Sequence, residues 1–318
     1  MPAAPRKTPL RDALRRRMAT RAGLSVPDLP PQSLEVGVRT RTFVEVPGPG
    51  PDAPLLLVLH GAGGTGAGMA ALTGLHTRGP AAGCAAVFPD GVLHVWNDSR
   101  SAPRLKRREG VDDVAFLVAL VDRARRSGPS GGRRVFAVGI SNGGFLAEHL
   151  ARYESLELDG IVLVASGATV SSRSACPTPR RPVRVLAFHG TADPLVPYGG
   201  GPIGPMRRLA ERRAGRPGEP EEPGRGVAAP IEEVCADWAR PGSSPVAEQL
   251  PPAGGDLAVD RLSWPDPLGT WTTLYRVRGG GHTWPGGAPY LPARIIGPVA
   301  RTLDATGILL DFVHAHVA

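Results

Sequence analysis

The sequence predicts an α/β fold: a mostly parallel central sheet with helices on both faces. Short, continuously apolar runs alternate along the chain with amphipathic stretches. Strands buried on both faces of a parallel sheet have this continuous apolar character, and their alternation with helices is typical of right-handed strand–helix–strand units. The chain has 318 residues, of which 42% are hydrophobic, so it is long enough for a buried core in one large domain.

The strands can be placed in order along the chain. From Val36 to Val46, apolar residues alternate with polar ones, which predicts an antiparallel edge strand or a hairpin. Five continuously apolar runs follow, then one segment rich in Trp, Thr and Tyr. They predict strands at 55–59, 84–88, 135–138, 161–164, 183–188 and 271–277.

Helical patterns separate and follow these strands. In the first helix, residues 111–126, an apolar stripe runs along one side and Asp112 and Asp113 lie at the N-terminal end, where the helix dipole favours acids. Three further helices are predicted at 142–153, 231–238 and 300–316. No internal repeat is visible.

Two segments break this alternation. Residues 1–35 predict a basic, flexible leader before a single catalytic domain over 36–318. Leu10, Leu14 and Met18 are spaced for a short helix on anionic lipid, and a solvated leader is the alternative. The Gly/Pro-rich stretch over 199–229, densest up to Gly226, predicts a mobile surface insertion, either a lid or a plain loop.

The charge does not indicate a nucleic-acid partner. The formal net charge is +8, and 35 of the 37 basic residues are Arg. Outside the N-terminus these Arg residues are scattered among acids, so no basic patch is expected. The Arg bias, with 42 Gly and 35 Pro, is typical of a GC-rich genome.

The cysteines and the absence of targeting segments give expectations for thiol state, metal binding and localisation. Cys84, Cys176 and Cys235 are too few and too widely spaced for a disulfide framework or a zinc site, so we expect buried thiols, with one bridge as the alternative, and no metal or cofactor. No apolar run follows the basic N-terminus as a secretory signal requires. No stretch approaches the ~20 apolar residues of a membrane span. We therefore expect a cytoplasmic protein, with secretion as the alternative; the sequence does not indicate its oligomeric state.

One motif carries the chemistry. The run GISNGG at residues 139–144 matches G-x-S-x-G, in which a nucleophilic Ser stands on a tight strand-to-helix turn. It follows the predicted strand at 135–138 and opens the helix at 142–153, which is the setting the motif requires. Glycines two residues before and after Ser141 are needed because side chains there would collide with neighbouring backbone. The pattern predicts Ser141 as nucleophile.

A nucleophilic Ser needs a base, and the base needs an orienting acid. The candidate acid, Asp193, follows the strand at 183–188, and the candidate base, His282, follows the strand at 271–277. Ligand sites of open α/β sheets gather at such carboxyl ends. His60 precedes Ser141, and His189 is interpreted as a strand-end packing residue. The remaining candidates are surface, turn or helix-cap residues: His314, His316, Asp90, Asp112 and Asp113.

A Gly-rich loop supplies the remaining component. Residues 59–64, LHGAGG, follow an early buried strand, and such a turn can offer a backbone N–H to an oxyanion alongside the N–H of Asn142. No G-K-[ST] follows, and the dinucleotide spacing is not met, so a phosphate cradle is not expected.

These motifs together resemble the polyhydroxybutyrate depolymerase-like esterases, α/β-hydrolases that neighbour feruloyl and acetylxylan esterases. The matching blocks run through most of residues 55–317, at 57–64, 88–91 with Trp96-Asn97, 111–114, 139–144, 189–198 and 280–287. The resemblance implies Ser141, Asp193 and His282 as the triad and Ala62 with Asn142 as oxyanion donors. It also implies Trp96 and Trp284 as pocket walls, with core packing as the alternative.

The resemblance has departures. Members of the family are often exported, which is the reason for secretion as the alternative to a cytoplasmic location. No separate polymer-binding domain is expected after the catalytic one, and attack on a solid granule is therefore not expected. The 89 positions from Asp193 to His282 include an insertion that looks longer than the family usually carries. The function expected is hydrolysis of a small or oligomeric carboxylic ester through an acyl-enzyme. A thioesterase or peptidase with the same triad, or a non-catalytic binding module, are the alternatives.

Overall fold

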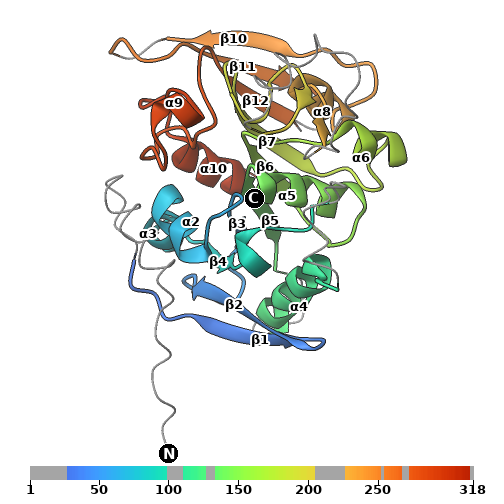
Figure 1. The fold of residues 1–318 in the computed structure, drawn as a ribbon, viewed down its shortest axis with the longest axis vertical. Coiled ribbons are helices and arrows are strands. Elements are labelled where there is room, and N and C mark those ends of the chain that lie inside the picture. Colours follow the sequence, from blue (N-terminus) through green and yellow to red (C-terminus); the bar gives the residue numbers. More distant parts are fainter. Residues whose placement is uncertain are drawn as a thin grey trace, which may run out of the picture.

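The architecture is one large twisted sheet between two layers of helices (Figure 1). The computed structural model describes residues 27–98, 110–126, 133–204, 226–251, 254–266 and 272–315. In this part of the chain, six parallel strands form the centre of the sheet in the order β4 (Ala85–Pro89), β3 (Leu55–Leu59), β5 (Val135–Ile140), β6 (Gly160–Val164), β7 (Arg184–Gly190) and β12 (Thr272–Val277).

Antiparallel strands extend the sheet at both edges. Next to β4 lie β2 (Arg39–Val46) and β1 (Gln32–Val36), and next to β12 lie β11 (Val259–Trp264) and β10 (Val246–Leu250). The central strands are continuously apolar because both of their faces are covered. In β3, for example, Leu57 and Leu59 pack into one core, and Leu56 and Val58 into the other.

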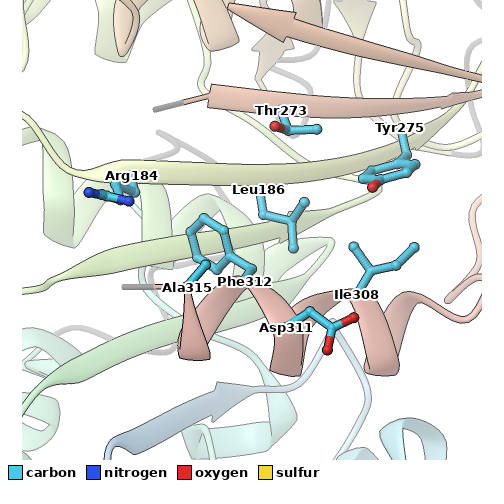
Figure 2. A pocket seen from close by; sticks show the side chains of 8 residues that line it. All are labelled: Arg184, Leu186, Thr273, Tyr275, Ile308, Asp311, Phe312 and Ala315. Carbon is cyan, nitrogen blue, oxygen red and sulfur yellow. The ribbon is translucent and has the colours of Figure 1, made fainter. Parts of the chain in front are cut away.

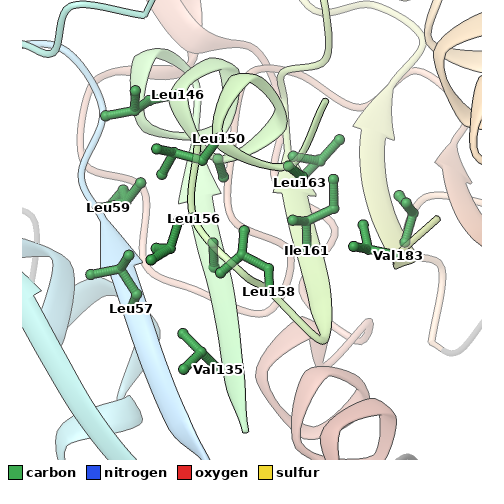
Figure 3. Packing of buried hydrophobic residues seen from close by; sticks show 14 of the residues in the cluster. Leu57, Leu59, Val135, Leu146, Leu150, Leu156, Leu158, Ile161, Leu163 and Val183 are labelled. Carbon is green, nitrogen blue, oxygen red and sulfur yellow. The ribbon is translucent and has the colours of Figure 1, made fainter. Parts of the chain in front are cut away.

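Each core is closed by its own helices. The first contains side chains of α4 (Asp113–Arg126), α5 (Asn142–Arg152) and α8 (Ile231–Asp237). Figure 3 shows Leu146 and Leu150 of α5 lying over this face of the sheet. The second contains side chains of α2 (Gly66–Thr73), α3 (Leu75–Ala81) and α10 (Ala305–His314). Shorter helices, α6 (Val170–Ala175), α9 (Ala293–Ile296) and a 3₁₀ turn at Val92–His94, lie in the connections.

The predicted strands are confirmed to within two residues at the ends that the structure describes. The segment at 36–46 is the hairpin alternative, because β1 and β2 pair around a turn at Gly37, whose φ is +57°. The sheet begins at Gln32, four residues before the expected boundary at Val36, so the end of the predicted leader belongs to β1. Strands β10 and β11 were not predicted, since their polar side chains leave no apolar run.

Three predicted helices are confirmed as α4, α5 and α8. The last one, α10, begins at Ala305 rather than Ala300, because the Asp304 carboxylate accepts the Gly307 N–H and caps the helix there. Helices α2 and α3 were missed: both are short, and α3 contains Pro80. Asp112 accepts the Ala115 N–H at the start of α4, as expected of a helix cap.

The predicted insertion at 199–229 contains regular structure at both ends. Its flanks form a small antiparallel pair, β8 (Gly201–Pro202) and β9 (Val227–Ala228). Ile203 and Ala228 are buried there against Phe145 of α5 and Val196. Residues 205–225 lie outside the described residues, as do residues 1–26 of the predicted leader with Leu10, Leu14 and Met18, and also Trp271 and His316.

The three cysteines are buried and unpaired, which excludes the disulfide alternative. None of the helices that the structure describes is both long and apolar enough to cross a bilayer.

Candidate active site

Ser141 stands at the turn between β5 and α5 in a strained backbone conformation. Its φ is +54° and its ψ is −123°, which non-glycine residues rarely adopt. The flanking glycines are sterically required: a Cβ at Gly143 would lie 2.4 Å from the carbonyl oxygen of Leu59, and a Cβ at Gly139 would lie 2.4 Å from that of Gly143. The Ser141 side chain is partly exposed, while its neighbours on α5 are buried.

Asp193 and His282 are in direct contact. His282 Nδ1 lies 2.7 Å from Asp193 Oδ2, and both side chains are buried. The other carboxylate oxygen, Oδ1, accepts the backbone N–H groups of Leu195 and Val196, at 2.8 and 2.9 Å. With Nδ1 donating to the carboxylate, His282 keeps Nε2 as the unprotonated, basic nitrogen.

The environment keeps Asp193 ionised. Burial alone would raise the pKa of its carboxyl, but the charge and hydrogen bond of His282, with the hydrogen bond from the Val196 N–H, bring the pKa below its usual value. A carboxylate rather than a carboxylic acid therefore faces His282.

The sheet brings Ser141, Asp193 and His282 to the same end of its central strands, the carboxyl end. They follow β5, β7 and β12, which run parallel in the order β5-β6-β7-β12 and so end on the same side. The loop that carries His282 packs closely on the end of β7, where a Cβ at Gly190 would lie 2.2 Å from the Gly280 carbonyl oxygen. The Tyr290 hydroxyl also donates to the His282 carbonyl oxygen, at 2.7 Å.

A second buried histidine touches the acid. His189 Nε2 donates to the Val196 carbonyl oxygen at 2.9 Å and lies 3.6 Å from Asp193 Oδ2. Burial lowers the pKa of His189, against the opposing charge of Asp193. The residue therefore braces the Asp193 loop as a neutral ring, which is more than the strand-end packing expected from the sequence. Its i, i+4 spacing from Asp193 was the only sequence signal.

The Gly-rich loop after β3 is held beside Ser141. A Cβ added at Gly61 would meet Ser141 Cβ at 3.5 Å. His60, buried below the loop, donates from Nδ1 to the Gly61 carbonyl oxygen at 2.8 Å and accepts the Gly91 N–H on Nε2 at 3.0 Å. These bonds require one neutral tautomer, and burial lowers the pKa of His60 to about 4.

The two expected oxyanion donors have their N–H groups available. Within the described residues, the N–H of Ala62 donates to no other backbone or side-chain group, and Ala62 is exposed. Asn142 is the first residue of α5, so its N–H has no acceptor within the helix. The positive end of the α5 dipole reinforces this N–H.

The two tryptophans expected as pocket walls belong to the core. Trp96 and Trp284 are each 1% exposed, and their indole N–H groups donate to the His60 carbonyl oxygen and to Thr306 Oγ1, at 2.9 and 3.1 Å. The structure thus favours the packing alternative for both.

Two acids expected as turn or cap residues connect elements that lie far apart in the sequence. Asp113 forms a buried ion pair with Arg41 at 2.7 Å. Asp90 joins two elements, since its carboxylate accepts the Gly66 N–H and the Thr42 hydroxyl.

A separate groove lies elsewhere on the sheet (Figure 2). It occupies about 410 Å³ between α10 and strands β7 and β12, with Phe312 and Ile308 facing Leu186 and Tyr275. It includes Arg184 and Thr273, near the amino ends of those strands, and none of the candidate site residues. Among the described residues, no group of three or more His, Cys, Asp or Glu is arranged to hold a metal ion.

The fold, with Ser141, Asp193 and His282 at the carboxyl ends of the central strands, defines an α/β-hydrolase. An acetyl xylan esterase from Aspergillus awamori has a similar fold, with a TM-score of 0.53 and 11% identity, covering 80% of this chain and 94% of that one. No family profile matches the sequence.

A sequence relative places the chain within this class. It is 33% identical over 270 residues to "Putative esterase NocK" of Nocardia uniformis subsp. tsuyamanensis, covering 82% of this chain and 74% of the relative. It is also 27% identical over 132 residues to "Probable feruloyl esterase C" of Aspergillus niger, covering 42% of each chain. The chain therefore belongs to the α/β-hydrolase esterase family that includes NocK, and it is a carboxylic ester hydrolase.

Proposed function

We propose that the enzyme cleaves short-chain, acetyl, feruloyl or hydroxyalkanoate-oligomer esters through an acyl-enzyme on Ser141. The observation that carries the mechanism is the Asp193–His282 hydrogen bond at the carboxyl end of the central strands, where the strained Ser141 turn lies. A carboxylate on Nδ1 directs the basic nitrogen of the imidazole away from the acid, as a general base for a serine hydroxyl requires.

The reaction has two steps. His282 Nε2 removes the Ser141 proton as Oγ attacks the ester carbonyl, and Asp193 stabilises the imidazolium that forms. The N–H groups of Ala62 and Asn142 bind the oxyanion. His282 then gives its proton to the departing alcohol, which leaves acyl-Ser141.

Deacylation uses the same groups. His282 takes a proton from water as the water attacks the acyl carbon. Collapse of the second tetrahedral intermediate returns that proton to Ser141 Oγ and releases the carboxylic acid.

The acyl range is a separate part of the proposal. The motif resemblance supports hydroxyalkanoate esters, and the name of the Aspergillus niger relative supports feruloyl esters. Thioesters and peptides need the same nucleophile and base, so only substrate profiling separates them from oxoesters.

A substrate panel tests both parts. The panel contains p-nitrophenyl esters from acetyl to octanoyl, methyl ferulate and a hydroxybutyrate trimer, together with a matched thioester and a matched anilide. The oxoesters should be cleaved fastest, and Ser141→Ala should lose turnover by at least ~10³-fold with an unchanged thermal unfolding midpoint. Retained turnover in Ser141→Ala, or faster cleavage of the thioester or anilide, would contradict the proposal.

A further inference from the structure

The expected oxyanion donors come from two different segments. Ala62 follows β3, and Asn142 follows β5. The strands themselves are paired, with Leu59 opposite Gly139, so their ends are fixed relative to each other. The turns beyond the strand ends are not fixed by this pairing. Since an oxyanion needs donors within about 2.7–3.1 Å, something must hold the two turns in register.

Trp96 is hydrogen-bonded to the residue that provides one donor. Its backbone N–H donates to Asn142 Oδ1 at 2.7 Å, and its carbonyl oxygen accepts from Asn142 Nδ2 at 3.1 Å. The same Nδ2 also donates to the Asp98 carboxylate. The Asn142 carboxamide is therefore fully engaged with residues 96–98, and the start of α5 is tied to this segment.

The Trp96 side chain reaches the loop that provides the other donor. Its indole N–H donates to the His60 carbonyl oxygen at 2.9 Å, and its ring packs on the His60 imidazole with centroids 4.8 Å apart. His60 in turn bonds the Gly61 carbonyl oxygen, one residue before Ala62. Trp96 thus joins the two donor segments, through its main chain to Asn142 and through its buried indole to His60.

The segment that carries Trp96 is itself anchored. The Asn97 N–H donates to Asp113 Oδ2 and its carboxamide to the Val111 carbonyl oxygen, both at 2.7 Å. Asp113 is locked by its buried ion pair with Arg41 on β2. The bridge is therefore fixed to α4 and to the sheet as well as to the two turns.

We infer that Trp96 is a positioning residue that sets the distance between the two N–H donors of the oxyanion hole. This inference rests on the proposed function, because it assumes that the ester oxyanion is bound by Ala62 and Asn142. It assigns Trp96 no contact with substrate: the side chain acts through His60, and the main chain through Asn142.

Two variants cut the bridge at different points. Trp96→Phe removes the indole N–H while keeping an aromatic ring on His60, and Asn142→Ala removes the carboxamide while leaving the Asn142 backbone N–H in place. Trp264→Phe is the matched control, since Trp264 is also buried in the first core but lies on β11, away from both donors. Ser141→Ala reports on the proposed function itself.

The readouts are kcat and KM for p-nitrophenyl butyrate and the inhibition constant of an alkyl trifluoromethyl ketone. The ketone forms a tetrahedral adduct whose oxyanion needs both donors. In each bridge variant we expect kcat to fall at least ~10-fold, short of the ~10²–10³ lost with a whole donor. KM should change less than about threefold, and ketone binding should weaken by the factor lost in kcat/KM. Trp264→Phe should match the wild type.

The outcomes separate the two ideas. If both bridge variants fold, keep kcat within twofold and bind the ketone normally while Ser141→Ala is inactive, the bridge inference is wrong and the proposed function stands. A loss of kcat without weaker ketone binding also contradicts the bridge. If Ser141→Ala is fully active, the proposed function fails first.

Discussion

Replacing Asp193 by Asn should disable the enzyme through the tautomer of His282. Oδ1 of Asp193 accepts two backbone N–H groups, from Leu195 and Val196, while Oδ2 faces His282 Nδ1. An Asn side chain can satisfy the two backbone donors only with its carbonyl oxygen. Its NH₂ group then points at His282 Nδ1, which must become an acceptor, and the ring proton moves to Nε2.

The expected loss follows from this geometry. With its proton on Nε2, His282 cannot accept the Ser141 proton, and the charge that stabilised the imidazolium is gone. In serine proteases the same change costs about 10⁴ in kcat, or roughly 5.5 kcal/mol of transition-state stabilisation. We expect Asp193→Asn to lower kcat by about 10³–10⁴ with KM nearly unchanged.

Steady-state kinetics with p-nitrophenyl butyrate and thermal unfolding of the same preparation test this reasoning. Because both backbone hydrogen bonds are kept, the unfolding midpoint should stay close to that of the wild type. Asp256→Asn is the control, since the Asp256 carboxylate accepts hydrogen bonds from the Thr302 N–H and hydroxyl rather than from any triad residue, so kcat should be unchanged. A folded Asp193→Asn variant with less than a tenfold loss in kcat would refute the assigned role of Asp193.

Three further predictions concern stability. Gly143→Ala should lose about 1–3 kcal/mol in urea unfolding, with a parallel loss of activity, because its Cβ would lie 2.4 Å from the Leu59 carbonyl oxygen; Gly50→Ala, which meets nothing within 4 Å, should be neutral. Glu148→Ala should cost about 3 kcal/mol by leaving the fully buried Arg152 with one carboxylate partner fewer, whereas Glu233→Ala breaks an exposed pair with Arg173 and should cost less than about 1 kcal/mol. Equal costs for the two Glu variants would contradict this account. The pKa of His60 is lowered to about 4 in the folded protein from an ordinary 6.5 in the unfolded chain, so the unfolded chain takes up a proton on His60 first as the pH falls. The free energy of unfolding should therefore decrease by about 3 kcal/mol between pH 6.5 and pH 4, and His60→Gln should flatten that part of its pH dependence, measured by urea unfolding.

The centre of the fold was predictable because burial on both faces leaves a strong trace in the sequence. Strands such as β3 and β5 have no polar position, so their apolar runs are visible without any partner. Strand β10 is the opposite case: Glu248 and Gln249 are exposed, and only its pairing with β11 makes it a strand. Strand pairing at a polar sheet edge is a tertiary property that local patterns do not carry.

The same division applies to the candidate site. Ser141, Asp193 and His282 follow predictable strands in a recognisable order, and the backbone donors follow from the motif. The supporting residues do not. Asp113 looked like a helix cap until Arg41, 72 positions earlier, was placed beside it. Trp96 looked like a pocket wall, because nothing in the sequence shows that its indole N–H meets the His60 carbonyl oxygen.

The central claim is that Ser141 is the residue that takes the acyl group, and covalent labelling tests it most directly. The folded enzyme should be treated with a fluorophosphonate, and the adduct located by peptide mass spectrometry while turnover of p-nitrophenyl butyrate is followed. We predict one adduct per chain, on Ser141, with turnover lost in proportion to labelling and no adduct in Ser141→Ala. An adduct on another residue that abolishes turnover, or full labelling of Ser141 with turnover retained, would contradict the account.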